Sequence, residues 1–258
     1  MIEAALEAGR AANRIYQGEF AVHTKEDDSP VTAADHAAEQ IILRHLARCA
    51  PQVTVVAEEQ CAAGNVPVVG AEFFLVDPLD GTREFVQRRG EFTVNIALIR
   101  EAAPALGVVY APVTGQLFAG DVAAGHATRA TLAPDHSADP ALHPIRVRAL
   151  PAAGLTAVAS RSHRSPETDA YLSHYAIAEL VAVGSSLKFC LVAAGEADLY
   201  PRLGPTMEWD TAAGHAVLAA AGGQVIGPDA RPLRYGKPQF RNSWFVASGA
   251  FLPHAFAA

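Results

Sequence analysis

Hydrophobic positions in the first half of the chain follow two kinds of spacing. Over residues 1–17 and 34–48, apolar side chains recur every three or four positions, which predicts helices that each bury one face. Short apolar runs at 53–57 and 73–76 predict buried strands. Between residues 91 and 130, apolar stretches separated by Gly, Pro and short polar turns predict an antiparallel meander.

The second half of the chain has a different pattern of hydrophobic positions. Residues 133–154 hold four prolines and show little periodicity, so we expect this segment to connect two lobes, residues 1–140 and 141–258. Beyond it, strand-like and helix-like stretches alternate, which predicts an α/β layer. The expected strands are 156–160, 178–184 and 224–226, and the expected helices are 165–176, 186–197 and 209–221.

The composition is that of a folded chain with an acidic balance. Half of the 258 residues are hydrophobic, which is enough for one large domain or for two compact lobes that share a core. The chain has 20 Lys and Arg against 27 Asp and Glu, a net charge of −7, which argues against a general nucleic-acid binder. A small anionic substrate is compatible with this charge if the site is locally positive.

Cysteines and candidate targeting segments add no further chemistry. The three cysteines show no paired metal-type spacing, so neither a disulfide framework nor a zinc site is predicted. Glu3, Glu7 and Arg10 interrupt what would be the apolar core of a signal peptide, and no stretch approaches the roughly 20 apolar residues of a membrane span. We therefore expect a cytoplasmic protein without an integral membrane segment; peripheral membrane contact stays open.

Four carboxylates stand at predicted strand ends or helix starts. Glu58 follows the first buried run, Asp77 and Asp80 follow the second, and Asp210 begins a predicted helix. Neighbouring buried carboxylates are costly unless a cation neutralises them, and ligand sets made of oxygen alone favour a hard ion such as Mg²⁺. For any one of these acids, a helix cap or an ordinary surface strand end is the commoner explanation. Their joint placement favours a metal site.

The residues that follow Asp80 indicate what such a metal would act on. Gly81 permits close backbone approach, and the amides that open a helix at Thr82 form a natural anion site, which together with a metal indicates phosphate. An Asp-Gly turn with a Thr cap is the ordinary alternative. Phosphatases of the haloacid dehalogenase type place two Asp residues two apart, in D-x-D-G-T. The three-residue spacing of Asp77 and Asp80 favours metal ligands and a water nucleophile over a covalent aspartyl phosphate.

Three motifs in order resemble the inositol monophosphatase superfamily of Mg²⁺-dependent, lithium-sensitive phosphatases: EE at 58–59, DPLDGT at 77–82 and WDTAAGHAV at 209–217. Further stretches are similar to the 3′(2′),5′-bisphosphate nucleotidases of the CysQ type within that superfamily, namely 25–35, 81–100 and 184–218. The resemblance implies a layered αβαβα sandwich. It would have an α+β N-terminal lobe, an α/β C-terminal lobe and the active site between them.

The resemblance also implies roles for the residues that match the family motifs. It makes Mg²⁺ ligands of four side chains and one backbone carbonyl: Glu58, Asp77, Asp80, Asp210 and the carbonyl of Leu79. Asp35 would be the base that deprotonates a water molecule through the hydroxyl of Thr82. Glu59 would reach a metal through water.

Substrate-binding positions follow from the same resemblance: Gly81, Thr82, Ser160, His163, Gly184 and Lys188. Ser and His where a strand meets a loop can donate hydrogen bonds to an anion, and Lys adds a compact positive charge. The alternatives are structural. His163 would then be a solvated loop histidine, Ser160 a helix-start residue and Lys188 a side chain that reaches solvent from an apolar helix.

The activity implied by the resemblance is a phosphomonoesterase that converts 3′-phosphoadenosine 5′-phosphate to AMP and phosphate, and so removes a by-product of sulfur assimilation. An inositol-phosphate or sugar-phosphate phosphatase with the same metals is one alternative. A non-catalytic nucleotide or metal sensor that keeps the fold is another. The expected partner is a small nucleotide bisphosphate and not a nucleic acid, and the sequence leaves a monomer and a homodimer both open.

Overall fold

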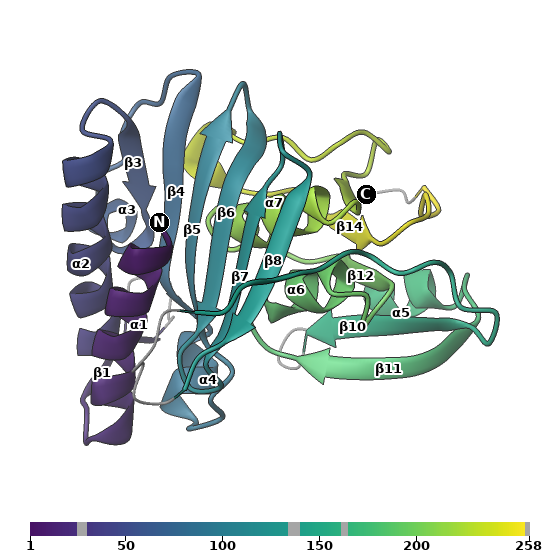
Figure 1. The fold of residues 1–258 in the computed structure, drawn as a ribbon, viewed down its shortest axis with the longest axis horizontal. Helices are drawn as coiled ribbons and strands as arrows, with labels where there is room; N and C mark the ends of the chain where they lie inside the picture. Colours follow the sequence, from purple (N-terminus) through teal and green to yellow (C-terminus); the bar gives the residue numbers. More distant parts are fainter. Residues whose placement is uncertain (25–29, 134–139, 161–164, 256–258) are drawn as a thin grey trace.

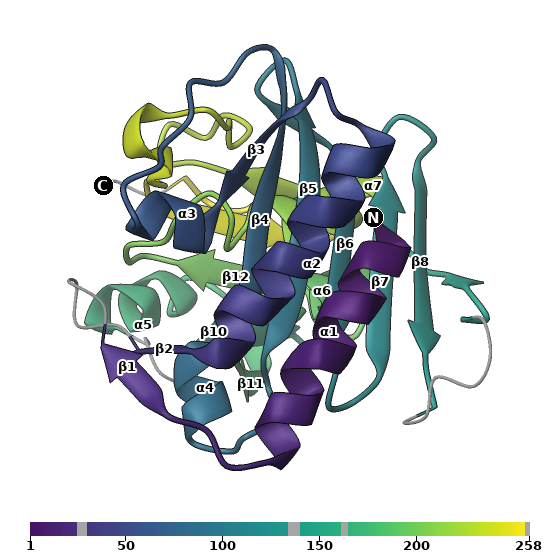
Figure 2. The same cartoon turned by 90° about the vertical axis from the view of Figure 1, so that its left-hand side faces the viewer.

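The computed structural model describes residues 1–24, 30–133, 140–160 and 165–255. Their helices and sheets stack in alternating layers of helix, sheet, helix, sheet and helix (Figure 1). Figure 2 shows α1 (Ile2–Gln17) and α2 (Ala33–Cys49) lying side by side across one face of the larger sheet. Within the described ranges, no helix combines the length and the apolar character that a membrane crossing needs. The layered αβαβα arrangement expected from the sequence is confirmed.

The larger sheet contains the predicted meander. Its seven strands lie in the order β3-β4-β5-β6-β7-β8-β9, with β3 parallel to β4 and the following pairs antiparallel. A two-stranded ribbon, β1 (Val22–Thr24) with β2 (Pro30–Thr32), precedes α2. The strands of the larger sheet are β3 (Thr54–Ala57), β4 (Glu72–Asp80), β5 (Thr93–Arg100), β6 (Ala103–Ala111), β7 (Gln116–Asp121), β8 (His126–Thr131) and β9 (His143–Pro144).

Alternate residues of the larger sheet face different helical layers. On β4, Phe74 belongs to the cluster that packs against α1 and α2, whereas Phe73 belongs to the cluster that packs against α6 (Leu187–Ala193) and α7 (Ala212–Ala220). Successive side chains of a strand point to opposite faces, so a strand that is apolar throughout is buried on both faces. The uninterrupted run FFLV is the sequence signature of this double burial.

The smaller sheet forms the second sheet layer. Its strands lie in the order β11-β10-β12-β14-β13, with parallel pairs at β10 and antiparallel pairs at β14. The helix α5 covers its outer face through Tyr171 and Leu172. The elements are β10 (Leu155–Ser160), α5 (Pro166–Leu172), β11 (Ile177–Val183), β12 (Leu199–Arg202), β13 (Gln224–Ile226) and β14 (Phe245–Ser248).

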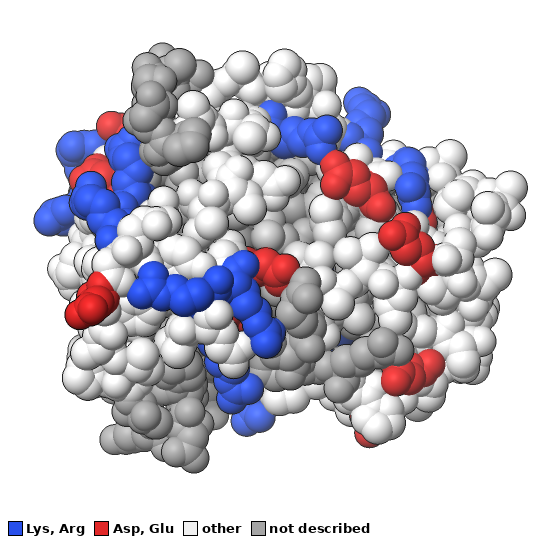
Figure 3. All heavy atoms as spheres, turned by 90° about the horizontal axis from the view of Figure 1, so that it is seen from below, with Lys and Arg blue, Asp and Glu red and all other residues white. Residues whose placement is uncertain are grey.

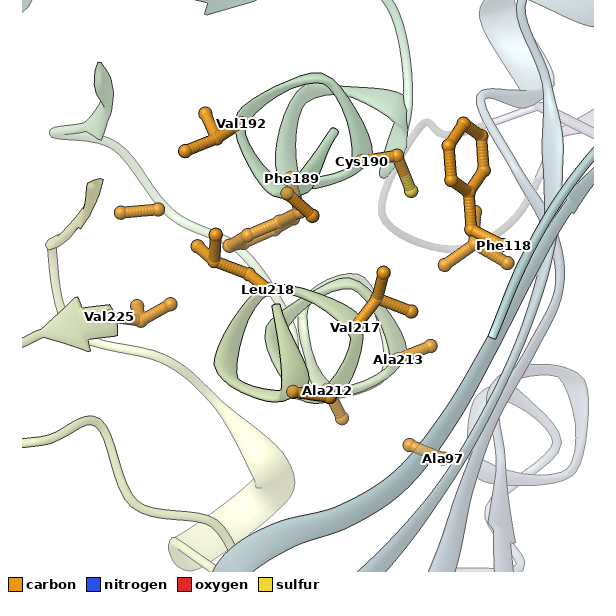
Figure 4. Close-up of a cluster of buried hydrophobic side chains, with 14 of the residues drawn as sticks. Ala97, Phe118, Phe189, Cys190, Val192, Ala212, Ala213, Val217, Leu218 and Val225 are labelled. Atoms are coloured by element: carbon orange, nitrogen blue, oxygen red, sulfur yellow. The ribbon is translucent and has the colours of Figure 1, made fainter. Parts of the chain in front are cut away.

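Two details of the second half differ from the sequence expectations. The helices α5, α6 and α7 are each shorter than the expected helices, and β9, β12 and β14 were not predicted. One core cluster joins α6 and α7 to both sheets, and Figure 4 shows Phe189 and Val217 between Phe118 of the larger sheet and Val225 of the smaller one. β9 extends the larger sheet although it lies beyond residue 140. The division into lobes at that residue stays a prediction.

Glycines allow α7 to lie directly on the larger sheet. A Cβ added at Gly107 of β6 would lie 2.4 Å from the carbonyl oxygen of Ala213 and 2.7 Å from the Cβ of Ala216. A Cβ added at Gly120 of β7 would lie 2.7 Å from the Cα of Val217. Backbones approach this closely only where a side chain is absent. The helix that begins just after Asp210 therefore has a fixed position on the sheet.

We predict that Gly107→Ala lowers the free energy of unfolding by about 1–3 kcal/mol, because the added methyl group pushes α7 away from β6. Urea denaturation followed by circular dichroism measures this change. Gly70→Ala is the matched control, since nothing lies within 4 Å of a Cβ added at Gly70. The control should stay within about 0.5 kcal/mol of the unsubstituted protein. Equal free energies of unfolding for the two variants would contradict the packing argument.

Candidate active site

Predicted site residues from both halves of the chain line one cavity. The cavity has a volume of about 530 Å³, and its walls include the ends of β4 and β10 and the starts of α4 (Thr82–Val86) and α6. Three predicted metal ligands thus face the same space as predicted substrate-binding positions, whereas Asp77 and Leu79 are buried and are not part of the lining. The predicted residues in its lining are Glu58, Asp80, Gly81, Thr82, Ser160, Gly184, Lys188 and Asp210.

A bulge near the end of β4 gives Asp77 and Asp80 different surroundings. Asp77 pairs with Asn95 of β5 and Asp80 pairs with Thr93, and the register shifts between the two pairs. The strand therefore continues through both acids, which corrects the expectation that it stops before them. Pro78 fits here because a bulge does not need its missing N–H. Asp77 is only 1% exposed, whereas Asp80 lines the cavity.

Burial and like charges raise the pKa of two of the predicted ligands. The pKa of Asp77 lies well above its ordinary value because the carboxyl group is buried, and because Glu58, Asp80 and Asp210 are negatively charged neighbours. The pKa of Asp210 is raised by burial and then by Asp80 and Glu58. Carboxylates in this situation favour the protonated form unless a cation offsets their charge.

The chemistry of these donors fits a hard cation. In the parts of the chain that the structure describes, no group of three or more His, Cys, Asp or Glu side chains forms a ready metal-binding cluster. The acids accept local hydrogen bonds instead: Asp77 Oδ1 from the N–H of Leu79 at 3.0 Å, and Asp210 Oδ2 from the N–H of Met207 at 2.8 Å. Mg²⁺ keeps several of its waters and is commonly held by one or two carboxylates. The donors therefore suit Mg²⁺, and the ligand assignment stays a prediction.

The structure brings the predicted catalytic pair together. Asp35 lies in the first turn of α2, where its Oδ2 accepts hydrogen bonds from the N–H and the hydroxyl of Thr32, each at 2.8 Å, as part of a capping box. Its Oδ1 accepts a hydrogen bond from the Thr82 hydroxyl at 3.3 Å. The same hydroxyl lies 3.3 Å from the carbonyl oxygen of Leu79. The helix cap thus fixes a buried carboxylate beside Thr82.

Glu39, which lies one turn after Asp35 on α2, was not predicted from the sequence. Glu39 is 3% exposed, and its Oε2 accepts the N–H of Glu59 at 2.8 Å. Burial raises the pKa of Glu39 to about 7. The contact caps α3 (Glu58–Ala62), whose first residue lines the cavity, while Glu59 is buried beside Glu39. The available signal was the spacing of four residues from Asp35, which places both acids on one helix face.

Ser186 and Asn95, which were also not predicted, connect Asp80 at the end of β4 with Asp210 before α7. Ser186 is 2% exposed, and its hydroxyl accepts a hydrogen bond from Asn95 Nδ2 at 2.8 Å. The same hydroxyl lies 3.0 Å from Asp80 Oδ2 and 2.9 Å from the carbonyl oxygen of Asp210. One hydroxyl proton cannot serve two acceptors at once, so Ser186 donates to one of them at a time. No local pattern in the sequence marks these residues.

Two predicted substrate-binding residues have partners within the protein. The Gly184 N–H donates to a carboxylate oxygen of Glu91 at 2.8 Å. The Lys188 ammonium donates to the carbonyl oxygens of Val183 and Ser185. Lys188 is 5% exposed, and burial lowers its pKa to about 8. The alternative reading of Lys188 as a residue that reaches solvent is therefore wrong.

The second half of the chain contributes further positive charge. Arg202 and Arg241 line the cavity together with Arg83, which follows the DGT sequence. Ser160 lines the cavity at the end of β10, whereas His163 lies outside the described residues. On the face seen in Figure 3, Lys and Arg side chains form separate groups among acidic and uncharged residues. The cavity lining therefore includes cationic side chains in a chain whose net charge is −7.

Solved structures share this architecture over almost the whole chain. The crystal structure of CysQ from Bacteroides thetaiotaomicron has a TM-score of 0.81 at 37% identity and covers 97% of this chain and 96% of that one. An inositol monophosphatase from Anabaena has a TM-score of 0.73 at 28% identity and covers 96% of this chain and 88% of that one.

Curated relatives and a family model agree with the structural likeness. The 3′(2′),5′-bisphosphate nucleotidase CysQ of Escherichia coli (strain K12) is 45% identical over 244 residues, which cover 93% of this chain and 95% of that protein. CysQ of Salmonella typhimurium is 46% identical over 232 residues, or 88% of this chain and 89% of that protein. The model of the inositol monophosphatase family matches residues 1–248. The chain belongs to the inositol monophosphatase family.

Proposed function

We propose that this chain is a Mg²⁺-dependent phosphomonoesterase that converts 3′-phosphoadenosine 5′-phosphate to AMP and phosphate. The main support is its similarity, over 93% of its length, to proteins named 3′(2′),5′-bisphosphate nucleotidase. The cavity adds physical support, because it sets predicted metal ligands beside cationic side chains. A bisphosphate substrate suits this arrangement, since a metal neutralises the reacting phosphate and cations accommodate the other one.

The metal ligands in this proposal are four acids and one backbone oxygen: Glu58, Asp77, Asp80, Asp210 and the carbonyl of Leu79. Mg²⁺, when bound, supplies charge neutralisation at the phosphate and activation of a water molecule. The raised pKa of Asp77 and of Asp210 supports this role, because the same repulsion that favours protonation also favours a cation. Lithium sensitivity, expected from the family resemblance, stays a prediction.

Thr82 and Asp35 carry the proton in the proposed reaction. The Thr82 hydroxyl donates to Asp35 Oδ1 at 3.3 Å, so its oxygen is oriented to accept a hydrogen bond from the attacking water. As the water oxygen bonds to phosphorus, its proton passes to Thr82 while the Thr82 proton passes to Asp35. The bond between phosphorus and the ribose 3′-oxygen breaks, the leaving oxygen takes a proton from solvent, and Asp35 later returns its proton to solvent.

The surroundings of the two acids in DPLD favour water as the nucleophile. Asp77 is 1% exposed and accepts a hydrogen bond from the N–H of Leu79. The carboxylate of Asp80 lies 3.0 Å from the Ser186 hydroxyl and 3.4 Å from Asn95 Nδ2. An attacking carboxylate needs an unobstructed line to phosphorus. Asp77 does not line the cavity, and the Asp80 carboxylate is already in contact with Ser186 and Asn95. We therefore favour a water molecule beside Thr82 as the nucleophile.

The second half of the chain supplies the proposed contacts to the rest of the nucleotide. Lys188, Arg202 and Arg241 line the cavity, and each can accommodate an anionic group. An inositol monophosphate has no second phosphate for these cations, which is why we prefer the nucleotide. The expected cytoplasmic location and the choice between monomer and homodimer stay predictions.

The substrate proposal is tested by parallel assays with 3′-phosphoadenosine 5′-phosphate and inositol 1-phosphate in Mg²⁺. We expect the nucleotide to have the higher kcat/KM by at least about tenfold, because each additional charge-assisted contact contributes about 1.5–3 kcal/mol. EDTA should abolish phosphate release from both esters. A higher kcat/KM for the inositol ester would overturn the substrate proposal, and no Mg²⁺-dependent release from any tested ester would favour a non-catalytic sensor.

The roles of the two catalytic groups are separated by two asparagine substitutions. Asp80→Asn should abolish turnover through weakened Mg²⁺ binding. Asp35→Asn should lower kcat by about 10²–10⁴-fold and leave the Mg²⁺ concentration for half-maximal activity nearly unchanged, because it removes only the proton acceptor. Asp229→Asn serves as the control, since the side chain of Asp229 is 65% exposed. A change in Mg²⁺ requirement as large in Asp35→Asn as in Asp80→Asn would refute the separate roles.

A further inference from the structure

The buried carboxylate of Glu208, two residues before Asp210, is held by residues 236–242. Of these residues, only Arg241 lines the cavity. Glu208 is fully buried, and its two carboxylate oxygens accept the N–H groups of Gly236 at 2.8 Å and Lys237 at 2.9 Å. The Lys237 ammonium also lies 2.7 Å from Glu208 Oε1. Residues 236–242, here called the clamp segment, therefore bind residues 206–211, here called the Asp210 loop.

Asn242 at the end of the clamp segment reaches both ends of the Asp210 loop. Its side chain is buried, and its Nδ2 lies 3.1 Å from Thr206 Oγ1, 2.8 Å from the Met207 carbonyl oxygen and 3.1 Å from Thr211 Oγ1. Its backbone N–H donates to the Thr206 carbonyl at 3.0 Å. A single amide thus ties residues on either side of Asp210.

Met207 links this amide to the carboxylate of Asp210. The Met207 carbonyl accepts from Asn242, while the Met207 N–H donates to Asp210 Oδ2 at 2.8 Å. Met207 also pairs with Arg241 as an isolated antiparallel bridge. The Met207 N–H belongs to the peptide group of Thr206, whose carbonyl accepts the backbone N–H of Asn242, and the Met207 carbonyl belongs to the next peptide group, which the Asn242 side chain contacts. Asn242 therefore holds both peptide groups that flank Met207, and the first of them donates to Asp210.

The clamp segment adopts a strained backbone to make these contacts. Gln239 and Phe240 have φ values of 56° and 52°, in the left-handed region that non-glycine residues rarely adopt. Phe240 is buried against Trp209 and Phe73, and its carbonyl accepts the N–H of Glu208 at 2.7 Å. Strain of this kind persists only where the surroundings enforce it, and it concentrates at functional sites.

We propose that Asn242 is a positioning residue that orients the Asp210 carboxylate, through Met207, toward the Mg²⁺ site. The inference rests on the proposed metal dependence and goes beyond it, because Asn242 does not line the cavity. Hydrogen-bonding partners that orient a ligand from outside the metal's own coordination typically change metal affinity by 10–100-fold when they are removed. The effect of Asn242 should therefore appear in Mg²⁺ affinity more than in the chemical step.

The test measures the thermal stability of the full-length, EDTA-treated protein as Mg²⁺ is added, since a ligand bound by the folded state raises Tm. This rise depends on the apparent Mg²⁺ dissociation constant of the folded protein, at which half of the sites are occupied, and that concentration is here called the Mg²⁺ midpoint. We expect Asn242→Ala to raise the Mg²⁺ midpoint by about tenfold. At saturating Mg²⁺, its kcat for the nucleotide should return to within a few-fold of the unsubstituted enzyme. A purely structural role would lower Tm without moving the Mg²⁺ midpoint.

Asp198→Asn is the matched control for a buried polar network. The Asp198 carboxylate accepts from Arg148 at 2.6 and 2.8 Å and from the N–H of Thr156 at 2.8 Å, and none of these residues lines the cavity. This variant should lower Tm and keep the original Mg²⁺ midpoint. If Asn242→Ala does not fold, Lys237→Ala is used in its place. It removes the ammonium contact to Glu208, keeps the backbone contact, and should shift the midpoint in the same direction.

The outcomes separate this inference from the proposed function. A midpoint that is unchanged in Asn242→Ala, or in Lys237→Ala where that variant replaces it, overturns the positioning role and leaves the phosphatase proposal standing. A shifted midpoint in a protein that does not hydrolyse the nucleotide supports the positioning role and overturns only the substrate. No response of the unsubstituted protein to Mg²⁺ overturns the metal dependence and the positioning role together.

Discussion

Carboxylates that share a buried site repel one another, and this repulsion is the constraint on which the rest of the structure depends. Burial and neighbouring acids raise the pKa of Asp77 and of Asp210, and the acids come from different layers of the fold. Backbone N–H groups, the Ser186 hydroxyl and the clamp segment hold them close. Without a cation, the repulsion among these acids is uncompensated. A bound cation offsets it, so the arrangement favours cation binding.

Because the acids lie on separate elements, the site depends on how the two sheets are joined. The helix α7 belongs to the core cluster that joins the two sheets, it lies closely on the larger sheet at Gly107 and Gly120, and it begins just after Asp210. Ser186 contacts Asp80 and Asp210 from the start of α6. The residues proposed to hold the metal and those proposed to hold the nucleotide are therefore parts of one packed unit. Substrate contacts and metal geometry are coupled through that packing.

Local sequence patterns predicted the elements that depend on residues near one another in the chain. Features that depend on contacts between distant residues were not predicted. The helices near the N-terminus, the meander and the cluster at DPLDGT were predictable from periodicity, motif and spacing. The end of β4 was misjudged because a bulge, which depends on the pairing with β5, continues the strand to Asp80. Glu39, Ser186 and Asn242 were missed because each is a single polar residue whose partners lie far along the chain. Their roles become visible only when the chain is folded.

Isothermal titration of the metal-free protein with Mg²⁺, at several pH values and in two buffers of different ionisation enthalpy, tests the central claim most directly. Burial and neighbouring acids raise the pKa of Asp77 and of Asp210, so both carboxyl groups hold protons more readily in the metal-free state than ordinary carboxyl groups do, and a cation binds their ionised forms. Mg²⁺ binding should therefore release protons, and its affinity should increase as the pH rises through those raised pKa values. Absence of Mg²⁺ binding, or binding that releases no protons and is independent of pH, would contradict the account.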